Sequence, residues 1–186
     1  KCLEETAQNM ASDTNVCIIN ADLSTPENLP HIVDEIVEKY GTIDCLLNIA
    51  GYTEPASIFS TTYENIQTTY TINCFSPLIL MRECAKHMKK QGGKILNVAS
   101  TAGMSPRPGW VSYASSKAAM ISISQTLTEE LAEYGIKVYC ISPGRCATNL
   151  RKKLAPDEDP HTIMQPEDVA RIICNLIGQG GNCIDG

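Results

Sequence analysis

Short apolar runs alternate with longer amphipathic segments along this chain, and this alternation limits the fold more than any other feature. The runs lie at residues 16–20, 43–48, 93–98 and 136–142, are rich in Val, Ile and Leu, and end in small or polar residues. Such runs are typical of buried strands. Strands that alternate with helices indicate an α/β protein. A chain of 186 residues, 43% of them hydrophobic, fits one domain with a sizeable core.

The intervening segments carry apolar residues at helical spacing. We expect helices over residues 1–11, 26–41, 62–90, 112–134 and 166–178, with the helix at 26–41 stopping at Gly41. Pro77 is expected to kink the helix at 62–90, and Asn73 interrupts its apolar side. Residues 145–161, between the last strand and the last helix, are irregular and indicate a lid.

Tyr113 and Lys117 open the helix at 112–134. Residues four apart lie on the same face of an α-helix, so the phenol and the ammonium are expected to be neighbours. An ammonium stabilises a phenolate, so Lys117 is expected to lower the pKa of Tyr113. The pair alone is a weak signal, because the same spacing is common on solvated helix faces.

Polar or small residues follow each of the three runs beyond residue 40. Ser100 ends the stretch 93–100 that contains the run at 93–98, Asn48-Ile49-Ala50-Gly51 ends the run at 43–48, and Pro143-Gly144 follows the run at 136–142. The carboxyl ends of parallel strands are where ligands bind in open α/β sheets. These residues are therefore candidates for a binding site.

These motifs together resemble the short-chain dehydrogenase/reductase family. The resemblance extends over nearly the whole chain, and its order and intervals are specific although each motif alone is weak. It implies a Rossmann-like doubly wound parallel sheet, incomplete at both ends, in a single domain spanning 1–186. The motifs that carry it are Asp22-Leu23, Asn48 to Gly51, Asn73, Ser100, Tyr113, Lys117, Pro143-Gly144 and Thr148.

The resemblance implies hydride transfer between NAD or NADP and a carbonyl or alcohol. Tyr113 would be the proton donor, Lys117 would support it and hold the nicotinamide ribose, Ser100 would orient the substrate oxygen, and Asn73 would hold a water in a proton relay. The implied cofactor-binding residues are Tyr113 and Lys117 together with Asp22, Leu23, Asn48, Ala50, Gly51, Pro143, Gly144 and Thr148. Asp22 would contact the adenine, although it equally fits a turn aspartate.

Basic residues near the predicted site suggest an anionic substrate, such as a sugar or polyol phosphate or a thioester on an acidic carrier. Arg107 and Trp110 lie in the loop between Ser100 and Tyr113, and Arg145 follows Gly144. Arg151, Lys152 and Lys153 also cluster near the predicted lid, and for Lys152 and Lys153 a solvated helix face is the favoured interpretation. By resemblance, the helices at 62–90 and 112–134 would pair two copies of the chain in a homodimer or homotetramer, although the apolar stripe from Met120 to Tyr134 also fits plain core.

Composition disfavours several other classes. The net charge of −6 argues against a nucleic-acid binder, and no apolar stretch approaches the ~18 residues of a membrane span. The nine cysteines show no metal-ligand spacing, so we predict no metal site and reduced, buried thiols in a cytoplasmic protein, Cys17, Cys45, Cys140 and Cys174 among them.

Three family features are not found in this sequence. The glycine-rich turn that would receive the cofactor pyrophosphate is missing, as is the residue that separates NAD from NADP, and a final strand would be expected after Gly186. We therefore expect part of a longer fold, whose run at 16–20 lacks its neighbouring strand. A fragment or pseudoenzyme that keeps only the helix-pair surface is the alternative function, and a module of a bifunctional enzyme is a third possibility.

Overall fold

The computed structural model describes residues 2–10 and 13–184, and its centre is a three-stranded parallel sheet. The strands are β1 (Cys45–Asn48), β2 (Gly93–Val98) and β3 (Ile136–Ile141), in the order β1-β2-β3. Leu46 of β1 pairs with Ile95 of β2, which pairs with Val138 of β3. The predicted α/β class is confirmed.

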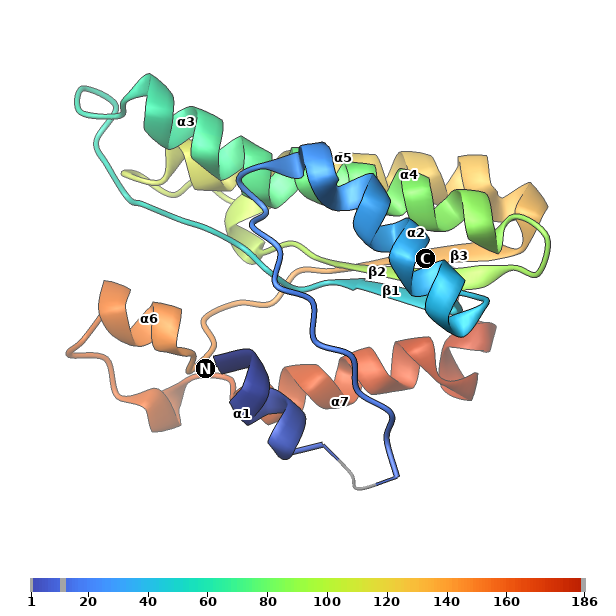
Figure 1. Ribbon diagram of the computed structural model, residues 1–186. Helices are drawn as coiled ribbons and strands as arrows, with labels where there is room; N and C mark the ends of the chain where they lie inside the picture. Colours follow the sequence, from blue (N-terminus) through green and yellow to red (C-terminus); the bar gives the residue numbers. More distant parts are fainter. Residues whose placement is uncertain (1, 11–12, 185–186) are drawn as a thin grey trace.

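Helices cover both faces of this sheet (Figure 1). On one face lie α2 (Leu29–Tyr40), α3 (Tyr63–Tyr70), α4 (Ser76–Met88) and α5 (Val111–Leu131), and on the other lie α1 (Cys2–Gln8) and α7 (Pro166–Ile177). A short helix, α6 (Asn149–Leu154), lies beyond the carboxyl ends of the strands. Short 3-10 turns lie at Pro26–Asn28, Thr101–Gly103, Ala132–Tyr134, Pro160–Thr162 and Gln179–Cys183.

Alternation along β2 and β3 gives each face of the sheet its own core, as expected for strands buried on both sides. Ile95 and Val138 pack toward α2, α4 and α5, together with Met88 and Met120, whereas the neighbouring Leu96 and Tyr139 pack against α7. The stripe predicted from Met120 to Tyr134 joins the first core, which corresponds to the plain-core alternative.

The predicted strand at 16–20 is not formed. Residues 13–25 run without regular structure from α1 on one face of the sheet to α2 on the other (Figure 1), and Val16 and Ile18 are 37% and 46% exposed. A strand needs a hydrogen-bonded neighbour, and these residues pair with no strand of the described sheet. Local apolar content was therefore insufficient to form the strand.

The long helix predicted at 62–90 is interrupted by a π-helix at Thr71–Phe75, which contains Asn73. It ends at Met88, and α2 ends as predicted with Gly41 at its C-cap, at φ 83°. None of the described helices is long and apolar enough to cross a membrane.

The prediction of buried thiols is wrong for Cys17 and Cys174, which are exposed, whereas Cys45 and Cys140 are half-buried. Cys17 is exposed because its predicted strand is absent, and Cys174 lies on the outer face of α7.

Candidate active site

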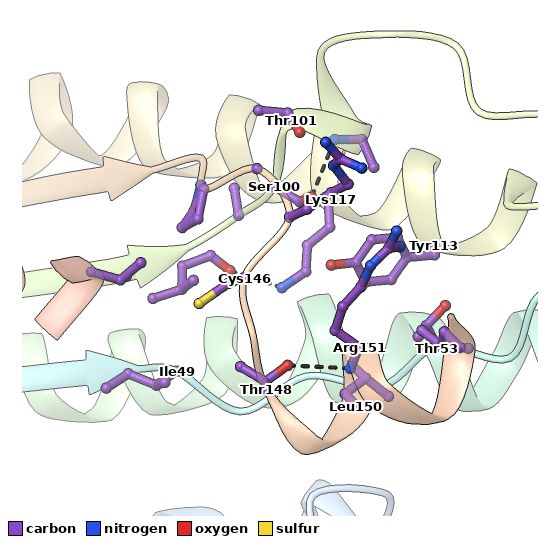
Figure 2. Close-up of a pocket in the computed structure, with 18 of the residues that line it drawn as sticks. Ile49, Thr53, Ser100, Thr101, Tyr113, Lys117, Cys146, Thr148, Leu150 and Arg151 are labelled. Atoms are coloured by element: carbon purple, nitrogen blue, oxygen red, sulfur yellow. Dashed lines mark hydrogen bonds between the residues drawn. The ribbon is translucent and has the colours of Figure 1, made fainter. Parts of the chain in front are cut away.

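A cavity of about 840 Å³ opens at the carboxyl ends of β2 and β3, between α5, α6 and α7 (Figure 2). Nine residues predicted for the site line it, namely Ser100, Arg107, Trp110, Tyr113, Lys117, Pro143, Gly144, Arg145 and Thr148. These residues lie up to 48 positions apart in the sequence (Ser100 to Thr148). The parallel sheet brings them together because its strand ends share one edge.

Lys117 is the most deeply buried charged residue of this cavity, with a residue exposure of 4%. Its Nζ donates a hydrogen bond to the carbonyl oxygen of Val98, over 2.8 Å, and lies 5.8 Å from the centre of the Tyr113 ring. Tyr113 and Lys117 therefore share one face of α5, as their spacing predicts, and both border the cavity (Figure 2).

Burial changes the pKa values of both side chains toward their neutral forms. It raises the pKa of Tyr113, an effect that a side-chain hydrogen bond with Ser100 opposes. It lowers the pKa of Lys117, which the nearby thiols of Cys74 and Cys140 oppose. The expected lowering of the Tyr113 pKa by Lys117 is therefore not observed, because the cost of desolvating a phenolate dominates.

Ser100 is held at the end of β2 by a compact turn. Its Oγ accepts a hydrogen bond from the backbone N–H of Ala102, over 3.1 Å. Gly103, at the end of this turn, lies so close to α5 that a Cβ there would come within 2.7 Å of the backbone at Lys117 and Ala118. The absence of a side chain at Gly103 thus allows the turn that carries Ser100 to pack directly on α5.

Asn73 does not line the cavity but ties three segments together behind it. Its side chain accepts a hydrogen bond from the N–H of Tyr52 over 2.8 Å and donates to the carbonyl of Tyr52 over 2.9 Å. It also donates to Ser116 Oγ on α5, over 2.9 Å. A Cβ on Gly51 would lie 3.5 Å from both Asn73 Oδ1 and Lys117 Nζ, so the turn after β1 is packed against both.

The remaining predicted cofactor residues lie outside the cavity. Asp22 is exposed, and its carboxylate accepts hydrogen bonds from the backbone N–H and the hydroxyl of Ser24, both over 2.8 Å; the backbone bond is the main cause of its lowered pKa. The Leu23 carbonyl accepts from Ser76 Oγ, and Asn48 donates to Asn97 Oδ1. With Ala50 and Gly51, these residues are not brought to the cavity. Asp22 therefore has the contacts of a turn aspartate.

The arginines near the site differ in whether a carboxylate pairs with them. Arg107 is exposed at the cavity and has no carboxylate partner among the described residues. Arg145 is instead paired with Glu158, with Nη1 2.6 Å from Oε1. Arg151, for which the sequence leaves both an anion-binding role and a solvated face open, lines the cavity and binds the same carboxylate.

Sequence reasoning missed much of the apolar cavity wall. Val169 and Ile173 of α7 line it, and their i, i+4 spacing on a helix was a usable signal. Leu150 and Leu154 of α6 were assigned only to an irregular segment. Ile49, Thr53 and Cys146 also line the cavity and carried no distinctive motif. Among the described residues, no three His, Cys, Asp or Glu side chains gather in a way that could hold a metal ion.

Comparison with known proteins matches the chain and its fold to one family. The model of the short chain dehydrogenase family matches residues 1–159. A 3-oxoacyl-[acyl-carrier-protein] reductase of Thermotoga maritima is 28% identical over 99% of this chain and 78% of its own length. A 2,3-dihydro-2,3-dihydroxybenzoate dehydrogenase of Bacillus subtilis is 30% identical over 89% of this chain and 74% of its own length.

Solved structures agree with these sequence matches. ElxO with NADP bound superposes with a TM-score of 0.84 at 27% identity, over 91% of this chain and 73% of its own. A 4-hydroxyisoleucine dehydrogenase complexed with NADH gives a TM-score of 0.80 at 27% identity, over 90% and 75% of the two chains. Since the family model alone matches well over half of the chain, the protein belongs to the short-chain dehydrogenase/reductase family of NAD(P)-dependent oxidoreductases.

Proposed function

We propose that the cavity performs reversible hydride transfer between a nicotinamide and the carbonyl or alcohol carbon of a small substrate. The observation that carries this proposal is the convergence of Ser100, Tyr113 and Lys117 on one wall of the cavity, with Lys117 almost fully buried. Burying an ammonium costs free energy. A buried ammonium beside a phenol in a cavity therefore indicates a functional site more than a structural role.

The residues present fit the nicotinamide end of a cofactor. An ammonium has three N–H donors, and one of those of Lys117 is taken by the Val98 carbonyl. The two hydroxyls of a ribose would supply acceptors for the others, and Pro143, Gly144 and Thr148 would border the nicotinamide. The cofactor, NAD or NADP, supplies or receives the hydride when bound. Asp22, Leu23, Asn48, Ala50 and Gly51 remain candidates for its adenosine side.

Tyr113 would give its phenolic proton to the carbonyl oxygen during reduction. Burial raises its pKa, so the phenol stays protonated at neutral pH, which is the form that a proton donor must have. Ser100, held in place by its turn, would orient the same oxygen by a hydrogen bond. Asn73 would support the site from behind by fixing Tyr52 against α5, and its role in a proton relay stays a prediction.

The substrate proposed for this site is an anionic carbonyl or alcohol compound with an apolar body. Leu150, Leu154, Val169 and Ile173 give the cavity an apolar wall, which favours an acyl chain over a sugar. Arg107 is the cavity arginine whose charge no described carboxylate offsets, so it would receive the anionic group. An acyl-carrier thioester fits both features better than a polyol phosphate.

We also propose that the chain forms a single domain and that two copies of it associate through α3, α4 and α5. Ile66, Phe75 and Leu78 are 40%, 51% and 40% exposed on the α3–α4 segment, an apolar content unusual for a solvated surface. The buried stripe of α5 is used in the core, so α3 and α4 would supply most of the apolar contact.

Isotope transfer tests the hydride step directly. The protein is incubated with NADH or NADPH that carries deuterium at both positions of C4 of the dihydronicotinamide ring, together with a 3-oxoacyl thioester, and the product is analysed by mass spectrometry. Deuterium on the product carbinol carbon supports the proposal. Product that carries no deuterium would exclude the proposal. The absence of any product with both NADH and NADPH, across oxoacyl, hydroxylated and aromatic ketone probes, would also exclude it.

Arg107→Ala tests the anionic substrate. The variant is expected to raise KM about tenfold or more for an anionic thioester while leaving a neutral ketone analogue unchanged. Lys152→Ala is the matched control, because it removes one positive charge from an exposed position of α6. Equal effects of Arg107→Ala on both substrates would rule out this role.

A further inference from the structure

A single carboxylate on the lid holds two arginines of the cavity wall. Glu158 Oε2 accepts a hydrogen bond from Arg151 Nε over 2.6 Å, and its Oε1 accepts from Arg151 Nη2 over 2.9 Å. Arg145 Nη1 also donates to Oε1, over 2.6 Å. The Glu158 side chain is only 14% exposed, which is low for an acidic residue on a lid.

The lid segment, residues 145–164, is closed on itself at its base. The N–H of Met164 donates to the carbonyl of Arg145 and the N–H of Ala147 donates to the carbonyl of Met164, over 3.1 and 2.9 Å. Within this loop, α6 carries Arg151 alongside the cavity (Figure 2). Arg151 also lines a second, smaller cavity of about 170 Å³ that Glu158 borders, so the ion pair stands between the two spaces.

The geometry is that of an occupied anion site. A guanidinium binds a carboxylate or a phosphate through two parallel N–H donors, and Arg151 makes both of these bonds to Glu158. A second arginine, Arg145, converges on Oε1 of the same carboxylate. Hydrogen bonding by Arg151 lowers the pKa of Glu158, so the carboxylate is charged at neutral pH.

We propose that Glu158 is a specificity-determining residue that occupies a two-arginine anion site on the cavity wall and thereby excludes anionic groups from the α6 end of the cavity. An anionic substrate group is then directed to Arg107, which has no such competitor. The inference rests on the proposed function only in taking this cavity as the substrate site.

Glu158→Gln tests the proposal without any turnover. The amide keeps the shape of the side chain but gives up the charge, so the two arginines become available to an external anion. Titration of the full chain with inorganic phosphate by calorimetry should then show about tenfold tighter binding than in the parent protein. A change in the fluorescence of Trp110, the one tryptophan of the chain and a residue of the cavity wall, would place the phosphate in this cavity, and loss of the tighter binding on Arg151→Gln would place it at the α6 end.

Two comparisons separate this effect from a general change in charge. Asp157→Asn makes the same change in net charge at the neighbouring, exposed position and should leave phosphate affinity unchanged. Glu158→Gln combined with Arg151→Gln should lose the gain. If Glu158→Gln folds poorly, Glu158→Ala replaces it and should also bind phosphate more tightly than Asp157→Asn.

Equal phosphate affinity in the Glu158 and Asp157 variants would overturn the proposal. Hydride transfer would be untouched by that result, so the proposed function would stand. If hydride transfer failed but phosphate binding tightened at Trp110 in Glu158→Gln alone, the anion site would be real in a protein of another activity.

Discussion

The catalytic wall, formed by Ser100, Tyr113 and Lys117, contrasts with the lid segment at 145–164. On the wall, polar groups are fixed by backbone partners and close packing, as Lys117 is by Val98 and the Ser100 turn is by α5. On the lid, Arg145 is 62% exposed and is held by a single side-chain ion pair. Buried hydrogen-bonded groups hold their geometry, whereas exposed ion pairs contribute little and exchange readily. Under the proposed function, the fold separates a fixed reaction centre from an adjustable specificity surface.

Lys117→Met is expected to have the largest effect of the substitutions that alter the wall. The substitution keeps an unbranched apolar side chain but removes the ammonium beside Tyr113 and its bond to Val98. We expect turnover to fall by about 10²-fold or more, as for loss of a donor in a preorganised site. Steady-state assays check this, with Lys152→Met on the lid as the control. A loss of less than about threefold would contradict a reaction role for Lys117.

Gly103→Ala disturbs the wall through packing alone. A Cβ at this position would meet α5 backbone at 2.7 Å, so the Ser100 turn must move away from Tyr113. We expect a loss of about 1–3 kcal/mol in the free energy of unfolding, together with reduced turnover. Urea unfolding measures the first effect. Ser105→Ala, at an exposed position of the same loop, should change neither value, and equal stability of the two variants would refute the close-packing argument.

The pH dependence of reduction is the prediction with the smallest expected effect on turnover, and it tests how burial of the wall changes the pKa of Tyr113. Because burial raises the pKa of Tyr113, the acid form needed for reduction should persist up to and beyond the ordinary phenol value of ~10. The kcat/KM for reduction should therefore stay level through pH 9, while oxidation, which needs the phenolate, rises with pH. A fall in reduction centred near pH 7 would mean that Lys117 does lower the Tyr113 pKa.

The wall was largely predictable from sequence because its signals are local. Helical spacing paired Tyr113 with Lys117, and a strand-ending hydroxyl marked Ser100. The orientation of Lys117 toward a backbone carbonyl was not predictable, since it depends on how deeply α5 packs against β2. That burial also reversed the expected direction of the Tyr113 pKa shift.

The lid and the segment at 16–20 were less predictable because their structure depends on long-range partners. The pairing of Arg145 and Arg151 with Glu158, rather than with Asp157 or Asp159, follows from how the loop closes at Met164. Val16 and Ile18 have the composition of a strand but no neighbour in the described sheet, so they remain irregular. Both failures come from interactions that local spacing does not encode.

Parallel assays of turnover and nicotinamide binding in Tyr113→Phe test the central claim most directly. The substitution removes one hydroxyl and keeps the ring that packs at 5.7 Å from Trp110. The account predicts that turnover falls by about 10²–10⁴-fold while nicotinamide affinity stays within about twofold, because only the proton donor is lost. Tyr63→Phe, at a 77% exposed position, should alter neither. Turnover unchanged in Tyr113→Phe would contradict the account and leave Tyr113 as a structural residue.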